Sequence, residues 1–198
     1  MIIKCYNEKH PYLLFIDLEF NNQDLVQFSG LLFKNIDEET YQLAKSYTVY
    51  ITQKVCYPFA EYTSITNNFL ESNGISLEDA RLGIMEDFLG DVAVEELLII
   101  SHGLKNDRLV LGNAGINLSH YRIENDDIVE KRPIDGYCTF TNARRILNRP
   151  NHLTLADLAE ESGYYLHNAH NAYNDVWAEV SVFTFLKKME AQQGELLC

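Results

Sequence analysis

Two carboxylates stand two residues apart in the most strand-like stretch of the chain. The segment YLLFIDLEF, residues 12–20, is apolar and rich in β-forming residues, and it carries Asp17 and Glu19. Side chains two apart on a strand point to the same face, so both carboxylates face one side of the predicted sheet. Two interpretations are open: an exposed face with two solvated carboxylates, or a divalent-cation site, because Mg²⁺ prefers hard oxygen ligands.

A third carboxylate follows a second predicted strand. The apolar run ELLIIS, residues 96–101, is typical of a buried parallel strand, and His102 and Asp107 come after it. Binding sites in open α/β sheets collect beyond the carboxyl ends of the strands. The alternative is a surface turn in which Asp107 caps the next helix, and for this motif alone that alternative is favoured.

A histidine and an aspartate stand five residues apart near the start of the last predicted helix. In HNAHNAYNDVWAE, residues 167–179, Asp175 lies about one turn into the helix, and His170 lies in the loop before it. An imidazole has an unperturbed pKa of about 6.5 and can take up a proton near neutral pH. His167 lies further back, where a loop or packing role is expected.

The elements that must position these residues come as strands first and helices later. Three early strands predict an antiparallel meander, and the strand–helix units after it predict a mixed sheet with helices packed on it. Ser76 and Asp79 can cap the first long helix. The predicted strands are 12–20, 25–35, 46–52, 96–101 and 134–140, the predicted helices are 72–91, 141–149, 153–163 and 171–189, and 108–133 is predicted to be an exposed loop.

The bulk composition limits the class of protein. With 198 residues, of which 46% are hydrophobic, the chain is expected to form a single domain over residues 1–198. A net charge of −13 argues against a protein that coats long nucleic acid, but not against an enzyme that contacts a few phosphates. The chain has no apolar run of membrane-spanning length and no signal-peptide core, so we expect no membrane partner and a cytoplasmic location.

The cysteines give no sign of a metal site or a disulfide framework. They are far apart and form no CxxC pair, so we expect reduced thiols, with Cys56 and Cys138 buried. The four positions are Cys5, Cys56, Cys138 and Cys198.

The three acidic motifs, in this order, resemble those of the DEDDh 3′–5′ exonuclease family, the DnaQ-like branch of the ribonuclease H-like fold. FIDLEF resembles the first motif, SHGLKND the second and HNAYND the third. The segments GYCTFTNARRIL and LTLADLAEESGYYLHNAH are also similar to the family, so the resemblance covers nearly the whole chain. It implies an α/β fold with a ribonuclease H-like mixed sheet of five strands, three antiparallel and then parallel, flanked by helices.

The resemblance also implies a function. It implies hydrolysis of phosphodiester bonds from the 3′ end of single-stranded or short DNA or RNA, with release of nucleoside 5′-monophosphates. Two divalent cations, Mg²⁺ or Mn²⁺, would be held by Asp17, Glu19, Asp107 and Asp175, and His170 would be the general base. Related enzymes are often dimers, so a homodimer is one expected oligomeric state.

Residues that flank the motifs are candidates for contact with the substrate. Leu18, Phe20 and Tyr173 are candidates for stacking or wedging at the terminal base, although a core or surface role is favoured slightly for Leu18 and Tyr173. The substrate-binding residues that we predict are Leu18, Phe20, Asn21, Lys105 and Arg108.

The chain departs from the family pattern at two places. Thr-Thr-Gly often follows the first-motif glutamate in the family, but this chain has Phe20-Asn21-Asn22, and Asn106 stands where an aromatic often precedes the second-motif aspartate. Two alternatives stand beside the exonuclease. One is an RNA-specific oligoribonuclease-type enzyme with the same site. The other is a catalytically weak exonuclease-like module that acts as an interaction partner, and the residues after Glu19 are its only support. All five catalytic positions carry matching residue types, which favours an active enzyme.

Overall fold

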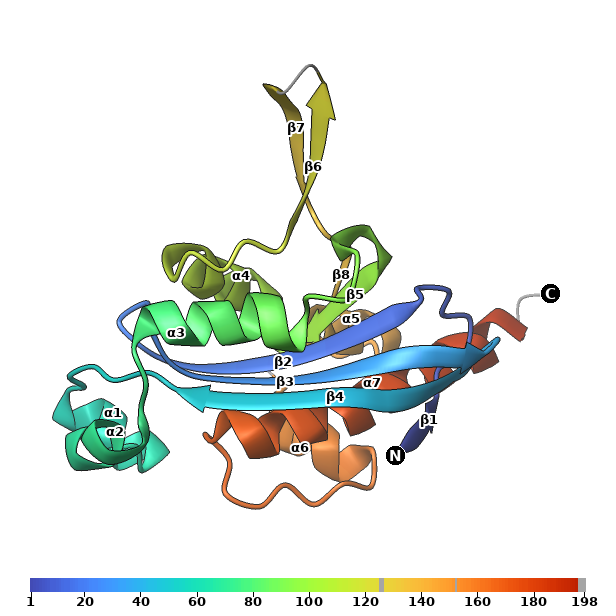
Figure 1. Ribbon diagram of the computed structural model, residues 1–198. Helices are drawn as coiled ribbons and strands as arrows, with labels where there is room; N and C mark the ends of the chain where they lie inside the picture. Colours follow the sequence, from blue (N-terminus) through green and yellow to red (C-terminus); the bar gives the residue numbers. More distant parts are fainter. Residues whose placement is uncertain (125–126, 152, 196–198) are drawn as a thin grey trace.

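A six-stranded mixed sheet with helices on both faces forms the centre of the computed structural model, which describes residues 1–124, 127–151 and 153–195 (Figure 1). The strand order is β1-β4-β3-β2-β5-β8; the first four strands pair antiparallel, and β2–β5 and β5–β8 pair parallel. These strands are β1 (Ile2–Lys4), β2 (Tyr12–Asn21), β3 (Asp24–Asp37), β4 (Thr40–Tyr50), β5 (Leu97–Ser101) and β8 (Gly136–Cys138).

The predicted mixed sheet is confirmed, with one strand more than expected. The additional strand, β1, has three residues and pairs with β4 at the antiparallel edge, and so short a segment carries no periodic signal. β4 begins at Thr40, six residues before its predicted start, because the polar residues before Ser46 also pair with β3. Both differences lie away from the acidic motifs.

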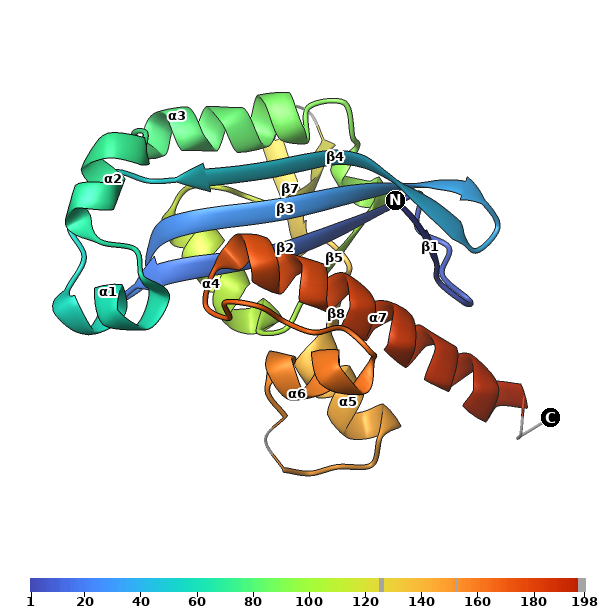
Figure 2. The same ribbon diagram turned by 90° about the horizontal axis from the view of Figure 1, so that it is seen from below.

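Helices cover both faces of the sheet, with α3 and α4 on one face and α7 on the other (Figures 1 and 2). Ser76 caps α3 as predicted, since its hydroxyl accepts a hydrogen bond from the Asp79 N–H at 3.0 Å. α3 continues directly into a π-helical turn, Gly83–Phe88. The α-helices are α1 (Tyr57–Thr63), α2 (Asn67–Asn73), α3 (Leu77–Leu82), α4 (Leu104–Asn113), α5 (Thr139–Ile146), α6 (Leu155–Glu161) and α7 (Ala172–Glu195), and a 3₁₀ turn covers Val94–Glu96.

The exposed loop predicted over residues 108–133 is wrong. Its first part is the second half of α4, which buries Val110 and Leu111 against the sheet. Its last part is a hairpin of β6 (Ser119–Glu124) and β7 (Asp127–Pro133), which projects from the body of the molecule (Figure 1). A hairpin that projects from the body of the molecule packs neither face against the core. Its sequence therefore need not alternate apolar and polar residues, and its hydropathy resembles that of a loop.

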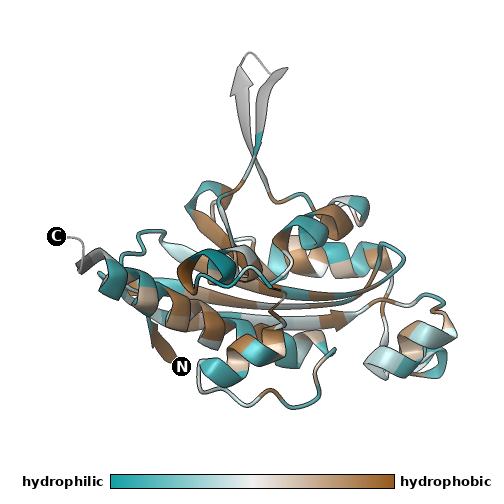
Figure 3. Ribbon diagram, turned by 180° about the vertical axis from the view of Figure 1, so that it is seen from behind, coloured by the Kyte–Doolittle hydropathy of each residue, from teal (hydrophilic) through white to brown (hydrophobic). Residues whose placement is uncertain are grey.

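The side chains of β2 alternate between two hydrophobic layers. Leu14, Ile16 and Leu18 point into the layer beneath α3 and α4. Leu13 and Phe15 point into the layer beneath α7. Hydrophobic residues accordingly concentrate along the central strands and α7 (Figure 3). Because the side-chain period of a strand is two, the odd-numbered positions that follow Phe15 also face α7.

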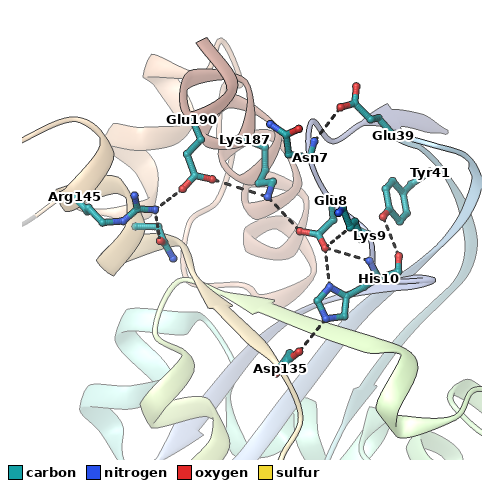
Figure 4. Close-up of polar contacts among 11 residues, drawn as sticks. Asn7, Glu8, Lys9, His10, Glu39, Tyr41, Asp135, Arg145, Lys187 and Glu190 are labelled. Atoms are coloured by element: carbon teal, nitrogen blue, oxygen red, sulfur yellow. Dashed lines mark hydrogen bonds and ion pairs between the residues drawn. The ribbon is translucent and has the colours of Figure 1, made fainter. Parts of the chain in front are cut away.

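A network of paired charges joins the N-terminal segment to the second half of α7 (Figure 4). We call Glu8, His10, Asp135 and Lys187 the Glu8 network. The Glu8 carboxylate, which is buried, contacts His10 Nδ1 at 2.7 Å and Lys187 Nζ at 3.3 Å, and His10 Nε2 contacts Asp135 at 3.1 Å. These contacts tie the residues before β2, the residue before β8 and α7 to one another.

The cysteine expectations are partly wrong. Cys56, at the N-terminus of α1, is exposed and Cys138, at the end of β8, is half-buried, whereas Cys5 is fully buried. Cys198 lies outside the described residues. In the described part of the chain, no helix combines the length and the apolar character that crossing a bilayer requires.

Candidate active site

Three carboxylates from two elements converge where α7 begins. Asp17 and Glu19 follow Phe15 at intervals of two on β2 and therefore face α7, whose first turn carries Asp175. One carboxylate oxygen of each residue lies within 4.8 Å of one oxygen of each of the others. Asp17 and Glu19 are half-buried and Asp175 is buried, so this acidic site is not a solvated strand face.

The fourth predicted carboxylate, Asp107, lies beside this group. It stands in the first turn of α4, is 6% exposed, and accepts a hydrogen bond from the Ser101 hydroxyl at the end of β5. Its charge also acts on Asp17. The structure thus brings together the carboxyl end of β5 and the acidic positions of β2, as expected for adjacent parallel strands.

The site concentrates negative charge. Burial and the charges of Asp175, Asp107 and Glu19 raise the pKa of Asp17 well above its ordinary range. Burial, together with the Asp175 charge, raises the pKa of Glu19 to about 8, and burial raises the pKa values of Asp107 and Asp175 to about 6. Among the ion pairs of the described residues, none involves these four carboxylates.

The residues of the site fit divalent cations. Asp175 Oδ1 and Glu179 Oε2 are buried and have no hydrogen-bond partner in the part of the chain that the structure describes. A buried carboxylate oxygen without a donor costs free energy, so buried charges are normally paired or bound to metal. Carboxylate oxygens are the ligands that Mg²⁺ and Mn²⁺ prefer.

His170 is held at the edge of the acidic site by its main chain. Its N–H donates a hydrogen bond to Asp175 Oδ2 at 3.0 Å, and its φ is 67°. Its ring packs on Tyr62 of α1, with 3.8 Å between ring centroids, and its partial burial lowers its pKa. His167 is exposed and packs against Tyr165 instead.

The loop before α7 contains two residues with a left-handed backbone conformation. Asn168 and His170 both take a positive φ, 51° and 67°. Asn and His are among the residues that tolerate this left-handed region best. The loop contacts the start of α7, since Asn174 Nδ2 donates a hydrogen bond to the Asn168 carbonyl at 3.3 Å and the Asp175 N–H donates one to the Asn171 carbonyl at 3.0 Å.

Comparison with known proteins identifies the fold. No protein-family model and no curated protein matches the sequence. Exonuclease X in complex with 5′-overhanging duplex DNA matches with a TM-score of 0.61 and 14% identity, over 90% of this chain and 93% of that one. A 3′-exonuclease that recognises the histone mRNA stem-loop matches with a TM-score of 0.65 and 8% identity, over 92% and 84%.

The chain shares the mixed α/β fold of these exonucleases. E. coli Exonuclease I in complex with a dT13 oligonucleotide also matches, with a TM-score of 0.66 and 16% identity. The match covers 94% of this chain and 43% of Exonuclease I. The structural neighbours are therefore exonucleases, as the sequence resemblance implied, and the predicted fold is confirmed.

Three further residues support the site and were not predicted from the sequence. Glu179 is fully buried one turn after Asp175. Gln27 of β3 is also fully buried, and its Oε1 accepts a hydrogen bond from the Ala172 N–H at the start of α7. Tyr62 lies on α1, which we did not predict. The i, i+4 spacing of Asp175 and Glu179 is the one signal that could have been read from the sequence.

The predicted substrate-binding residues occupy different environments. Leu18 is 6% exposed and belongs to the core beneath α3 and α4, against which the half-buried Phe20 also packs. Asn21, the last residue of β2, accepts a hydrogen bond from the Cys56 thiol at 3.1 Å. Lys105 is exposed, whereas the Arg108 guanidinium donates a hydrogen bond to a main-chain carbonyl, that of Ile134.

The unusual residues after Glu19 have a structural role in the β2–β3 turn. Asn22 and Gln23 connect the paired residues Asn21 and Asp24, and both take a positive φ, 63° and 134°. Asn is well suited to such a position. A register shift between Glu19 and Phe20 lies beside the site, where β-bulges are common.

Proposed function

We propose that this chain is a metal-dependent 3′–5′ exonuclease that hydrolyses single-stranded or short DNA or RNA and releases nucleoside 5′-monophosphates. The observation that carries the proposal is the convergence of Asp17, Glu19 and Asp175 within 4.8 Å, in a fold shared with exonucleases. Paired charges would be expected if this convergence served only stability, and the acidic site has none among the described residues.

Two divalent cations, Mg²⁺ or Mn²⁺, would be held by Asp17, Glu19, Asp107 and Asp175. When bound, such cations acidify the attacking water and neutralise charge on the scissile phosphate and the leaving oxygen. A zinc-bound form of E. coli Exonuclease I with single-stranded DNA supports cation binding in this fold. The high pKa values of the carboxylates mean that cations must compete with protons for the site.

His170 would act as the general base. Because burial lowers its pKa below the ordinary value of about 6.5, its imidazole is largely neutral at pH 7 and can take a proton from the attacking water. The hydrogen bond from its main-chain N–H to Asp175 Oδ2 keeps His170 beside the carboxylates. Its contact with the exposed Tyr62 holds the ring at the rim of the site.

The surface around the site favours a short unpaired strand as substrate. The net charge of −13 would repel a long phosphate backbone, whereas a 3′ end needs only a few contacts. Lys105 is exposed two residues before Asp107 and would contact a phosphate of the substrate. Tyr173, which is exposed in the first turn of α7, would stack on the terminal base, since aromatic stacking tolerates every base.

The test is cleavage of 5′-labelled single-stranded DNA and RNA with Mg²⁺ or Mn²⁺. We expect stepwise shortening from the 3′ end, release of 5′-monophosphates, and complete loss with EDTA. Asp17→Asn should be inactive, while Asp91→Asn, an exposed carboxylate of the same type, should match wild type. If the wild type cleaves no substrate with either metal, the proposal is wrong and an interaction module remains.

Substrate length separates the two enzymatic possibilities. Cleavage confined to RNA of two to five nucleotides would identify an oligoribonuclease-type enzyme. Comparable cleavage of DNA and RNA over longer lengths would identify a general exonuclease. RNA preference would require a contact to the 2′-hydroxyl, which is the group that distinguishes the two sugars.

A further inference from the structure

Glu179 is a fifth carboxylate at the acidic site, and its side chain has no solvent exposure. It follows Asp175 by four residues on α7, so both side chains lie on one face of the helix. Its Oε1 accepts a hydrogen bond from the His102 main-chain N–H at 2.6 Å. The carboxylate thus spans from α7 to the end of β5, where Ser101 binds Asp107.

The second carboxylate oxygen of Glu179 has no such partner. Oε2 is buried and makes no hydrogen bond to any described residue. The charges that act on Glu179 are those of Asp17, Asp107 and Asp175, and all three are negative. One hydrogen bond to a main-chain N–H could be accepted equally well by an uncharged side chain such as Gln, so the turn after β5 does not by itself require a carboxylate.

We propose that Glu179 is a fifth anionic group of the cation site, which tightens the binding of divalent cations through the charge of its buried carboxylate. This inference rests on the cation site of the proposed function. Burial strengthens the effect, because electrostatic interactions are stronger away from water. The hydrogen bond of Oε1 to the His102 N–H fixes the carboxylate, so its charge stays close to Asp17 and Asp107.

Two substitutions separate the charge of Glu179 from its hydrogen bond. Glu179→Gln keeps an acceptor for the His102 N–H and removes the charge. Glu179→Asp keeps the charge and shortens the reach to that N–H. We expect Glu179→Gln to weaken Mn²⁺ binding by about 10- to 100-fold, the range typical of residues that support a metal site. Glu179→Asp should bind Mn²⁺ more tightly than Glu179→Gln does.

Mn²⁺ binding is measured directly, by calorimetry or by the paramagnetic resonance of free Mn²⁺, without nucleic acid. Thermal unfolding supplies a second readout. Without cations, Glu179→Gln should unfold at or above the wild-type temperature, because a neutral amide is less costly to bury than a carboxylate. With Mn²⁺, its melting temperature should rise less than that of wild type.

Glu160→Gln is the matched control, since it removes the same charge from an exposed position on α6 and should bind Mn²⁺ as wild type does. Equal Mn²⁺ affinity of Glu179→Gln and wild type would overturn the inference. So would a lower melting temperature with unchanged affinity, which indicates a purely structural residue. If wild type binds no Mn²⁺ at all, the cation site is wrong and the proposed function fails with it.

Discussion

The acidic site and the Glu8 network contain the same kind of group, a carboxylate withdrawn from water, in opposite electrostatic surroundings. Burial works against ionisation of Glu8, but hydrogen bonds from His10 and the charge of Lys187 overcome it and lower the pKa of Glu8. At Asp17, burial and three neighbouring carboxylates act in the same direction and raise the pKa.

The two regions lie at opposite ends of the same elements. Glu8 and His10 precede β2 and meet Lys187 in the second half of α7, whereas Asp17 lies late in β2 and meets Asp175 at the start of α7. The fold places the positively charged partners Lys187 and His10 beside the buried carboxylate of Glu8, which contributes to stability. Where the fold leaves carboxylates unpaired, they lower stability, which is the expected cost of the cation site that we propose.

The largest expected effect is on catalysis at the unpaired site. Asp17→Asn should lower the cleavage rate by about 10⁴-fold, equivalent to ~5 kcal/mol of barrier, because the residue lies among all the other carboxylates. Single-turnover cleavage of labelled single-stranded DNA measures the loss. A residual rate above one tenth of wild type would remove Asp17 from the mechanism.

The histidine substitutions come next. His170→Ala should lower the cleavage rate by about 10²-fold or more, the usual contribution of a general base. The cleavage rate of wild type should decline as the pH falls through the lowered pKa of His170. His170→Ala should not show this decline. His167→Ala is the natural control, since its ring packs on Tyr165 and it should retain wild-type activity. Equal losses in both variants would contradict the role given to His170.

Exchange of a carboxylate for an amide should have opposite effects on stability in the two regions. Glu8→Gln leaves Lys187 and His10 without their buried anion and should lower the free energy of unfolding by about 3 kcal/mol. Asp17→Asn relieves repulsion and should raise it by ~1 kcal/mol in EDTA. Urea denaturation of both variants measures the difference. Destabilisation by both would show that the two regions are alike.

The pH dependence of stability sharpens the same contrast. The folded-state pKa of Glu19 is raised to about 8, whereas its pKa in the unfolded chain is about 4.3. The contribution of Glu19 to the free energy of unfolding is therefore fully present below about pH 4.3 and is lost as the pH rises toward 8. Glu19→Gln should therefore gain stability relative to wild type between pH 5 and pH 8 in EDTA. Urea midpoints at four pH values test this, and Mg²⁺ should reduce the gain. A constant difference across this range would contradict the raised pKa.

The smallest expected effect concerns the ring contact beside the site. Tyr62→Ala should lower the cleavage rate about three- to tenfold, since an aromatic contact is worth about 0.5–1.5 kcal/mol. Tyr62→Phe keeps the ring and should stay near wild type. If the two variants behave alike, the tyrosine contributes through its hydroxyl or not at all.

Much of the site follows from local sequence. The alternation along β2 places Asp17 and Glu19 on one face, and the five-residue spacing places His170 just before the helix that carries Asp175. These relations hold because the backbone period of a strand or helix relates residues that are close in the chain. The same logic predicts the Ser76 cap and five of the six strands.

Only the tertiary structure decided the relations between residues far apart in the chain. The contact of Tyr62 with His170, the bond of Glu179 to His102 and the pairing of Glu8 with Lys187 leave no periodic trace in the sequence. Whether a buried carboxylate is paired or unpaired depends on which distant side chains come within a few ångströms of it. The sequence therefore determined which residues could do the chemistry, and folding decided which of their charges were left without a partner.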